Sequence, residues 1–300
     1  MKVLVTGAKG LLGSELCKQL VQKGDTVHAV DNLSRGNATV DCERFFNLDL
    51  TNTDCLGELD TDYNIIYHYA AINGTTNFYK KPNDVLRSNT LIDFNVFDFA
   101  SSLLSDPLVV YASSSEIVVN NTDKKLEESI NILINDITNP RWSYRLAKIS
   151  AENYLTNSNL KYLILRYFNV YGLHSNTGHF VADQIEKIKN NVFSLIGPYE
   201  TRSFCHVSDA IDATIHCAKS ASYDIVNIGN DEEIRIKSAA NIIAKSLGIN
   251  TSLVDWEYLD SRKGSTKNRC PDINKLKNLY PEYEPLSFEE GMIKLIAAKK

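Results

Sequence analysis

The sequence predicts an α/β fold in which a doubly wound parallel sheet carries a smaller C-terminal α/β lobe. Apolar runs of strand length alternate with helical patterns through the first half of the 300 residues, as in sheets covered by helices on both faces. A glycine-rich turn joins the first apolar run to the first helical pattern. From Gly172 onward the periodicity changes, which indicates that the chain leaves the main sheet.

The first element is a strand–turn–helix unit over Lys2–Gly13, which reads KVLVTGAKGLLG. Three glycines follow the apolar strand. Gly7 permits the tight turn, Gly10 lets the backbone approach a pyrophosphate, and Gly13 lets the helix pack closely on the sheet. The helix N-terminus then faces the phosphates of a bound dinucleotide. The spacing is GxxGxxG, which differs from the GxGxxG of the common fingerprint.

Asp31 supports the dinucleotide-binding interpretation. It ends the next apolar run, Thr26–Val30, and stands 18 positions after Gly13, close to the spacing of about 20 expected for an acidic residue on a ribose 2′-OH. A carboxylate there repels a 2′-phosphate, so NAD is favoured over NADP, although Arg35 nearby keeps NADP possible. The alternative is a plain βαβ unit in which Asp31 only caps a turn.

The remaining elements follow from the same periodicities. We expect strands at 43–46, 63–69, 107–112, 160–166 and 223–227. Pro82 introduces a helix over 85–104, and a second helix has Pro140 in its first turn and ends near Thr156. Two more helices are expected, one at 181–190 and a last one opened by a capping box at 287–290. We therefore assign residues 1–170, with later returns near 202–230, to a Rossmann-type NAD-binding domain. Residues 171–300 are assigned mainly to a substrate-binding lobe.

Two strand ends carry residues that suit a ligand site. The strand at 63–69 runs into Ala70 and Ala71, whose small side chains let the backbone pass close to a ligand. The strand at 107–112 ends in Ser113-Ser114-Ser115-Glu116, and ligands of open parallel sheets sit at the carboxyl ends of strands. Taken alone, the three serines and the glutamate are better explained as a strand exit with capping hydroxyls.

Tyr144 and Lys148 decide between these interpretations. They are four residues apart, on one face of the expected helix. A tyrosine with the ordinary pKa of about 10 is a poor base at neutral pH. A neighbouring lysine ammonium and the positive nicotinamide ring of NAD⁺ would favour the phenolate, which could then accept a proton from a substrate hydroxyl while hydride leaves carbon.

Composition narrows the class of protein. A net charge of −5 argues against a nucleic-acid binder, and no apolar run approaches the roughly 18 residues of a membrane span. The six cysteines form no CxxC pair, so we expect reduced cysteines and a cytoplasmic protein, with no signal peptide before the first strand. No metal site is expected. The histidines at 174, 179, 206 and 216 lack metal-ligand spacing and are interpreted as surface or packing residues.

The order of motifs resembles that of the extended short-chain dehydrogenase/reductase family, the NAD-dependent nucleotide-sugar epimerases and dehydratases. The matching segments are TGAKGLLG (6–13), VDNLSRG (30–36), HYAA (68–71), ASSSE (112–116), YRLAK (144–148), RYFNVYG (166–172), RSFCHVSDAIDA (202–213), NIGN (227–230) and RCPDI (269–273). Together they cover nearly the whole chain.

The resemblance implies roles for individual residues. Tyr144 would be the base, Lys148 would hold the NAD ribose, and Ser114 or Ser115 would bond the reacting oxygen. Asn169 and Arg202 would contact the diphosphate of a nucleotide sugar, and Arg269 would lie at the substrate; arginine forks suit phosphate and carboxylate groups. The expected NAD-binding residues are Gly7, Gly10, Leu11, Leu12, Gly13, Asp31, Asn32, Ser34, Asp49, Leu50, Ala70, Ala71, Asn89, Tyr144 and Lys148. A homodimer through the helices at 85–104 and 144–156 is also implied.

Within the family, the run SSSE followed by PRWSY is most similar to UDP-glucuronate decarboxylases, whose corresponding run reads STSE. Ser115 and Glu116 then match the serine and glutamate that, with an arginine matching Arg269, take part in chemistry at the sugar. The TDE triplet of dTDP-glucose 4,6-dehydratases is absent, whereas GDP-mannose dehydratases also carry a serine-glutamate run. The usual Tyr-Gly pair is replaced by residues 117–121, IVVNN, which predicts a different loop over the sugar.

We therefore predict an NAD-dependent enzyme that oxidises C4 of a nucleotide-diphosphate sugar to a transient ketone. Epimerisation is the first expectation, because it needs only the general constellation. Decarboxylation is a close second because of Glu116 and Arg269, and 4,6-dehydration is a further alternative. The rival from another class is a non-catalytic NAD-binding sensor, since fold alone does not fix function.

Overall fold

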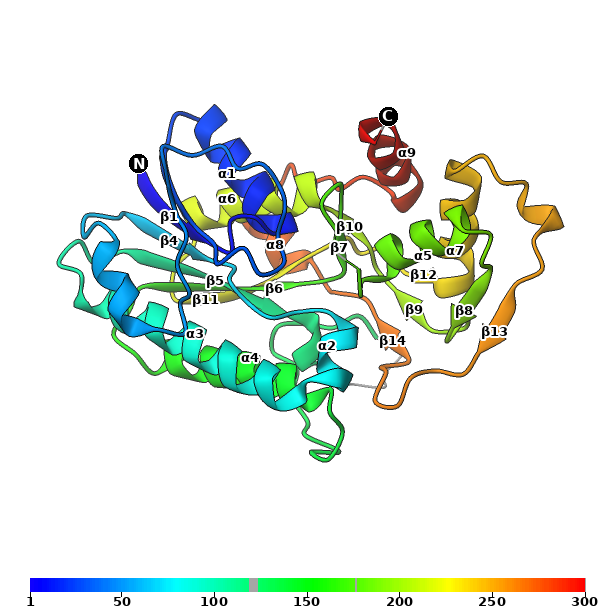
Figure 1. Ribbon diagram of the computed structural model, residues 1–300, viewed down its shortest axis with the longest axis horizontal. Coiled ribbons are helices and arrows are strands. Elements are labelled where there is room, and N and C mark those ends of the chain that lie inside the picture. Colours follow the sequence, from blue (N-terminus) through cyan, green and yellow to red (C-terminus); the bar gives the residue numbers. More distant parts are fainter. Residues whose placement is uncertain (119–123, 176, 300) are drawn as a thin grey trace.

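The computed structural model describes residues 1–118, 124–175 and 177–299. Its centre is a seven-stranded sheet in the order β11-β6-β5-β4-β1-β2-β3, in which every neighbouring pair is parallel (Figure 1). The strands are β1 (Lys2–Thr6), β2 (Thr26–Val30), β3 (Arg44–Phe46), β4 (Ile65–His68), β5 (Leu108–Ser114), β6 (Tyr162–Tyr167) and β11 (Asp224–Ile228). The predicted α/β class with a doubly wound parallel sheet is confirmed.

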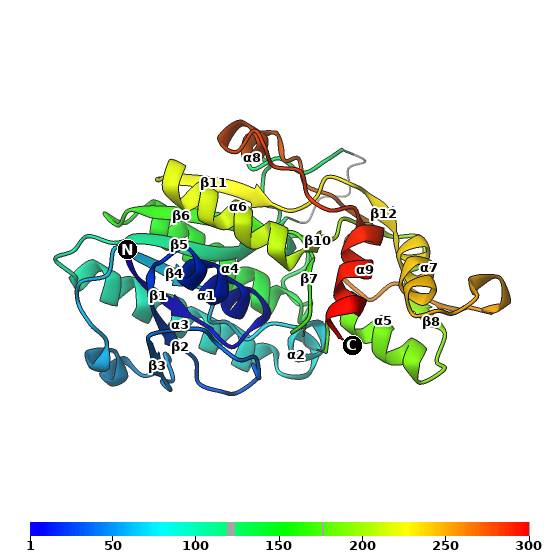
Figure 2. The same cartoon turned by 90° about the horizontal axis from the view of Figure 1, so that it is seen from above.

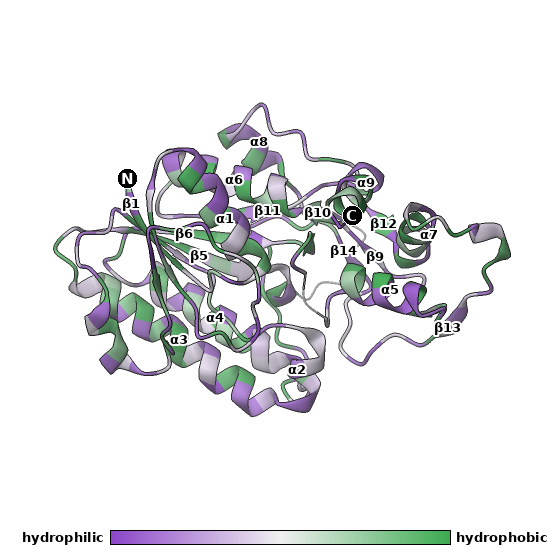
Figure 3. Cartoon of the chain, turned by 45° about the horizontal axis from the view of Figure 1, so that its top comes forward, coloured by the Kyte–Doolittle hydropathy of each residue, from purple (hydrophilic) through white to green (hydrophobic). Residues whose placement is uncertain are grey.

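Helices cover both faces of the sheet (Figure 2). One face carries α1 (Leu11–Gln22), α6 (Val207–Ser220) and α8 (Asn274–Leu279), and the other carries α3 (Pro82–Ser102) and α4 (Trp142–Thr156), with the short α2 (Thr75–Lys80) beside α3. Alternate residues of β1 enter the two cores: Val3 and Val5 pack under α1 and α6, and Leu4 packs under α3 and α4. Strands buried on both faces explain the continuous apolar runs of the sequence, which appear as green strands in Figure 3.

The strand order reverses at β1, which pairs with β2 on one side and with β4 on the other. The last residue of β1, Thr6, lies beside both Val30 and His68. In doubly wound sheets the ligand crevice opens at the carboxyl ends of the strands at such a switch point. The glycine turn and the Ala70-Ala71 segment both start there.

A smaller lobe lies at one end of the sheet (Figure 1). It contains α5 (Phe180–Lys189), β8 (Ser194–Ile196), β9 (Thr201–Arg202), β12 (Ile234–Arg235), α7 (Ile236–Ser246), β13 (Glu257–Leu259), β14 (Asn268–Arg269) and α9 (Phe288–Ala298). Its core is separate from the two cores of the sheet and gathers side chains from α5, α7 and α9. The strands β7 (Val170–Tyr171) and β10 (Cys205–His206) join the lobe to the sheet, and the 3₁₀ turns are η1 (Thr53–Glu58), η2 (Ser115–Ile117) and η3 (Thr251–Leu253).

Three details bear on the predictions. β5 continues to Ser114, so two of the serines still belong to the strand. Pro140 precedes α4, whose N-cap is Arg141, so its expected place in the first turn of the helix was wrong. It lies instead in the turn before the helix, where the Trp142 amide donates a hydrogen bond to the Asn139 carbonyl. The capping box of the last helix is confirmed, with Ser287 and Glu290 satisfying each other's backbone amides. Of the segment expected to replace the family's Tyr-Gly pair, positions 119–121 lie outside the described residues.

None of the described helices combines the length and the apolar composition needed to cross a bilayer.

Candidate active site

A cavity of about 620 Å³ runs along the carboxyl ends of β1, β4 and β5 and continues beneath the lobe. That volume is in the range of small-molecule and cofactor sites. Most of the predicted site residues line it: Gly7, Gly10, Leu11, Leu12, Gly13, Asp31, Asn32, Ser34, Leu50, Ala70, Ala71, Ser114, Ser115, Glu116, Tyr144, Lys148, Asn169, Arg202 and Arg269. Segments far apart in sequence thus form one continuous site.

The glycine turn is shaped so that only glycine fits at positions 7 and 13. Gly7 has a φ of +66°, and a Cβ there would lie 2.7 Å from the backbone nitrogen of Ala70. A Cβ on Gly13 would lie 2.3 Å from the carbonyl oxygen of Gly7. The backbone of the turn is therefore bare at the start of α1, as a dinucleotide pyrophosphate requires. This cradle fits NAD.

Asp31 both caps its loop and remains able to bind a ribose. Its Oδ2 accepts a hydrogen bond from the Lys9 amide at 2.9 Å, and its Oδ1 accepts one from the Leu33 amide at 2.8 Å. A carboxylate has about four lone-pair sites, so both oxygens keep acceptor capacity. Arg35, the residue that could have held an NADP 2′-phosphate, donates a hydrogen bond to the carbonyl oxygen of Asn73, and both residues line the cavity.

Two predicted cofactor residues do not line the cavity. Asn89 is fully buried beneath it and holds the backbone of Ile72, accepting from its amide at 2.7 Å and donating to its carbonyl at 3.0 Å. Asp49 is exposed and accepts from the Thr51 amide and hydroxyl at 3.0 and 2.9 Å. Asn89 therefore shapes the wall of the cavity, and Asp49 caps a turn next to Leu50.

Tyr144 is buried, and its ring stacks on Phe78 with centroids 4.8 Å apart. Burial raises the pKa of Tyr144 well above the ordinary value, and a hydrogen bond with Ser114 opposes this rise only in part. The Lys148 ammonium lies 5.9 Å from the Tyr144 ring centroid. Burial also lowers the pKa of Lys148, against the opposing charges of Asp93 and Glu152. In the protein alone, desolvation thus outweighs the phenolate stabilisation that the sequence led us to expect.

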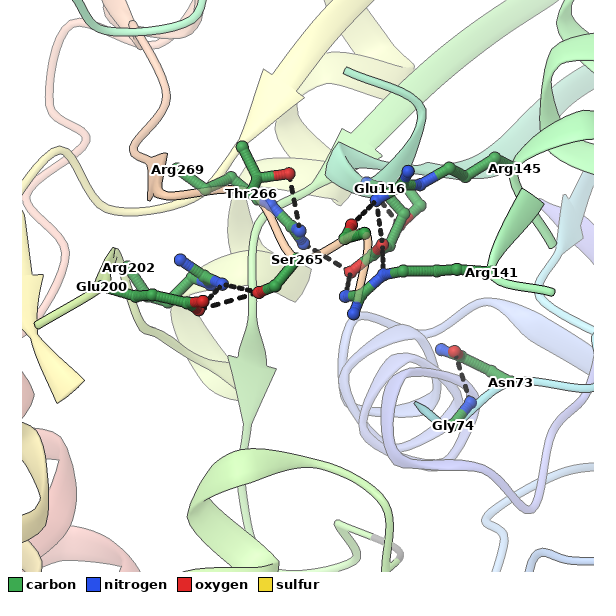
Figure 4. Close-up of polar contacts among 12 residues, drawn as sticks. Asn73, Gly74, Glu116, Arg141, Arg145, Glu200, Arg202, Ser265, Thr266 and Arg269 are labelled. Atoms are coloured by element: carbon green, nitrogen blue, oxygen red, sulfur yellow. Dashed lines mark hydrogen bonds and ion pairs between the residues drawn. The ribbon is translucent and has the colours of Figure 1, made fainter. Parts of the chain in front are cut away.

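Glu116 lies at the centre of a cluster of three arginines, which we call the arginine cage (Figure 4). Arg141 makes a bidentate pair with it, from Nε at 2.8 Å and from a terminal nitrogen at 2.6 Å. Arg269 donates to it at 2.5 Å and Arg145 at 3.4 Å. Arg145 also donates to the carbonyl oxygen of Gly264 in the lobe, at 3.1 Å. The cage therefore joins η2, α4 and the lobe around one carboxylate.

The cage carries more positive than negative charge. Burial by itself would raise the pKa of Glu116, but Arg141, Arg269 and Arg145 overcome it and hold that pKa well below the usual range. Burial lowers the pKa of Arg145 to about 10, so its guanidinium remains charged at neutral pH. One ionised carboxylate thus faces three guanidinium groups, which leaves an excess of two positive charges.

The two remaining substrate candidates lie on the lobe side. Arg202 donates to Glu200 at 2.6 Å and to the Ser265 hydroxyl at 3.0 Å (Figure 4). Burial and the neighbouring Arg269 lower its pKa to about 10, so it too stays charged at neutral pH. Asn169 adopts a φ of +35° and donates to the carbonyl oxygen of Ser203 at 2.9 Å.

Sequence reasoning missed three residues of the site. Arg141 and Arg145 lie close to Tyr144 in the sequence, but the motif does not predict that their side chains converge on Glu116. His179 was expected to be a surface or packing histidine, yet it lines the cavity at the N-terminus of α5. Burial and the charge of Arg35 lower its pKa, so its imidazole is neutral. The lobe's placement over the sheet brings it there, and no spacing in the sequence encodes that placement.

The model of the NAD dependent epimerase/dehydratase family matches residues 3–229. The chain belongs to this family. Its cofactor is NAD, and it is an enzyme of the class that contains nucleotide-sugar epimerases, dehydratases and decarboxylases, which confirms the predicted family, cofactor and broad activity.

Similar proteins include both decarboxylases and epimerases. The chain is 27% identical to a UDP-N-acetyl-α-D-glucosaminuronate decarboxylase of Bacillus cytotoxicus over 97% of this chain and 95% of that protein. It is 29% identical to UDP-glucuronic acid decarboxylase 1 of Danio rerio over 98% of this chain and 72% of that protein. The structure resembles a Bacillus cereus UDP-glucuronic acid 4-epimerase variant in complex with NAD and a fluorinated substrate analogue, with a TM-score of 0.85, 25% identity and coverage of 99% and 98%.

Proposed function

We propose that this enzyme oxidises C4 of a nucleotide-diphosphate sugar that bears a carboxylate, and then removes that carboxylate as CO₂. The observation that carries the proposal is the arginine cage around Glu116, next to Tyr144 and Lys148. Two of the similar proteins are decarboxylases of UDP-linked uronic acids, which supports the same assignment.

The charge of the cage selects for an anionic sugar. Arg141, Arg145 and Arg269 outnumber Glu116, and all four side chains are largely buried. A neutral hexose would leave this positive excess without a partner, whereas a sugar carboxylate would neutralise part of it. Arg202, which is paired with Glu200, adds a guanidinium donor on the lobe side, where a diphosphate would follow the sugar.

Tyr144, Lys148 and the serines account for the oxidation. Bound NAD⁺ supplies the hydride acceptor. Tyr144 takes the proton of the C4 hydroxyl, and Ser114, which already hydrogen-bonds Tyr144, holds the same oxygen. Lys148, on the same face of α4, supplies the positive charge that favours the phenolate. Gly7, Gly13 and Asp31 hold the dinucleotide as described above.

The ketone at C4 then makes the carboxylate leave. A C6 carboxylate is β to a C4 ketone, so the C5–C6 bond breaks with its electron pair passing into an enolate, and CO₂ departs. C5 takes up one proton from solvent in place of the lost carboxylate, and the hydride and the proton held by Tyr144 go back to C4, so no NAD is consumed. Glu116 stays ionised because of its low pKa, so it organises the arginines and does not supply the C5 proton.

Epimerisation of the same kind of substrate is the second candidate. It requires only Tyr144, Lys148 and a serine, and the similar Bacillus cereus epimerase variant is recorded with a glucuronic acid analogue. In that case the carboxylate would stay on the sugar, and hydride would return to the opposite face of C4.

The experiment that tests the proposal is incubation of the purified protein with NAD⁺ and UDP-, GDP-, dTDP- and CDP-linked hexoses and uronic acids, followed by mass spectrometry and proton NMR. Loss of CO₂ from a uronic acid supports the proposal. An isobaric product with inverted C4 replaces it by epimerisation, and loss of water replaces it by dehydration. No product anywhere, with NAD bound, would favour the sensor alternative.

We also propose that the enzyme is a cytoplasmic homodimer. The adjacent helices α3 and α4 present the partly exposed Leu86 and Leu91 of α3 as a candidate interface, and light scattering would test it. All six cysteines are unpaired, which fits a reducing compartment.

A further inference from the structure

A buried acid that no motif identifies lies beneath the catalytic helix. Asp93 on α3 is fully buried, and its Oδ1 lies 4.0 Å from the Lys148 ammonium on α4. Its two oxygens also accept hydrogen bonds, one from His68 Nε2 at 3.0 Å and one from the Tyr111 hydroxyl at 2.7 Å. The Tyr111 ring lies under the ammonium, 4.4 Å from centroid to Nζ.

The network continues from Asp93 to the glycine turn. His68 Nδ1 lies 2.6 Å from the Thr6 hydroxyl, and Thr6 Oγ1 accepts from the amides of Tyr69 and Ala70, each at 3.2 Å. Because Thr6 Oγ1 already accepts two hydrogen bonds, its own proton is directed to His68 Nδ1. His68 is then neutral and donates from Nε2 to Asp93, in agreement with a pKa that burial lowers.

This hydrogen-bond network connects the glycine turn to Lys148 on the catalytic helix. Thr6 immediately precedes Gly7, and the backbone of Ala70 packs against Gly7. One end of the hydrogen-bond network therefore lies directly under the glycine turn. The other end is Lys148, whose side chain is only 3% exposed. A lone buried ammonium tends to lose its proton, since desolvation lowers a lysine pKa by several units at fully buried sites.

We propose that Asp93 is a positioning residue that keeps Lys148 protonated and fixed beside Tyr144, and that ties it through His68 and Thr6 to the glycine turn. The inference rests on the proposed role of Lys148 in favouring the Tyr144 phenolate. Its chemistry is that of a buried counter-ion whose own orientation is held by two donors.

The groups that face Lys148 determine the sign of the effect on pH dependence. Besides Asp93, they are His68 on β4, Tyr111 on β5, and Tyr144 and Glu152 on α4. Loss of the Asp93 charge would lower the pKa of Lys148, because the charge opposes the effect of burial. It would also lower the pKa of Tyr144, since the same charge raises it. Both limbs of a bell-shaped pH profile would therefore move to lower pH.

The first test is the pH dependence of kcat/KM for Asp93→Asn, which keeps the volume of the side chain, removes its charge and exchanges one of its two acceptor oxygens for an NH₂ donor. We expect the profile to move to lower pH by about one unit or more, so that the loss of activity grows as pH rises. Tyr111→Phe is the control, because it removes a donor to Asp93 but leaves the carboxylate. Its profile should keep the wild-type position. An equal loss at every pH for Asp93→Asn, or none, would overturn the inference.

A second measurement needs no substrate. Asp93→Asn leaves Lys148 as an unpaired buried cation, whereas Asp93→Asn with Lys148→Met removes both charges. The double variant should therefore melt at a higher temperature than Asp93→Asn alone. Simple addition of the two single losses would refute the coupling. If no nucleotide sugar is turned over, the proposed function fails, and this comparison still decides whether Asp93 and Lys148 act together.

Discussion

Replacement of Glu116 by glutamine would show whether the arginine cage depends on one buried charge. Glu116 is 14% exposed, and its two oxygens accept from Arg141, Arg145 and Arg269. In Glu116→Gln the three guanidinium groups remain together without an anion. Removing one member of a buried ion cluster costs roughly 3–5 kcal/mol, because the charges left behind are uncompensated.

The expected change in melting temperature follows from chain length. With an unfolding entropy of roughly 2.1 cal/mol/K per residue, a chain of 300 residues unfolds with about 630 cal/mol/K. A loss of roughly 3–5 kcal/mol then lowers the melting temperature by about 5–8 °C. The matched control is Glu289→Gln, which removes a carboxylate paired with Lys245 where both side chains are more than half exposed. It should leave the melting temperature unchanged.

The pH dependence gives an independent check on Glu116. Its pKa in the folded protein is depressed, so the stabilisation is present above the unfolded-state value of about 4.3 and is lost as pH falls through the folded pKa. Differential scanning calorimetry should show the gap between wild type and Glu116→Gln narrowing as the pH is lowered below about 4. Adding Arg145→Met to Glu116→Gln should recover part of the loss, since one uncompensated cation is removed. A Glu116→Gln melting temperature no lower than that of the Glu289→Gln control would refute the proposed cage.

Two further predictions concern the base and the glycine turn. Tyr144→Phe keeps the ring stacked on Phe78 but removes the proton acceptor, so turnover should fall by a factor of about 10²–10⁴ with NAD binding retained. The control is Tyr154→Phe, which loses a hydroxyl bonded to Asp98. The measurements are steady-state kinetics and fluorescence titration of NAD, and equal turnover by the two variants would refute the role of Tyr144 as the base. Gly13→Ala places a Cβ 2.3 Å from the Gly7 carbonyl oxygen and should abolish NAD binding. The control is Gly57→Ala, whose Cβ meets nothing within 4 Å and which should bind NAD normally. Normal NAD binding by Gly13→Ala would contradict the close packing at the glycine turn.

The parts of the fold that the sequence predicted are those with local signals. β2 occupies the predicted range Thr26–Val30, and the long α3 follows from Pro82 and a run of helical periodicity. The strands of the lobe are different, because β9, β12 and β14 each contain only two residues. A pair of residues carries no period, so such strands form only when the tertiary fold brings their partners alongside.

The same distinction holds within the site. Tyr144 and Lys148 are found from their spacing, since four residues on a helix define one face. The partners of Glu116 could not be found in this way: Arg269 is 153 positions away, and its side chain reaches Glu116 only because β14 pairs with β9 in the lobe. Asp93 stands on a helix 55 positions before Lys148, in a segment whose periodicity indicates only burial.

The state of Tyr144 shows why the residues of a motif do not by themselves fix its chemistry. The sequence suggested that a nearby lysine would favour the phenolate, but burial of the ring raises the pKa of Tyr144, and the charges of Glu116 and Asp93 raise it further. Both acids serve other groups: Glu116 holds the arginines, and Asp93 faces Lys148. The anions that organise the site therefore also oppose ionisation of its base. It follows that a substrate carboxylate entering the cage would disfavour the phenolate still more, so the positive nicotinamide of bound NAD⁺ must contribute what Lys148 alone does not. Oxidation should therefore depend on NAD binding not only for a hydride acceptor but for the charge that prepares Tyr144.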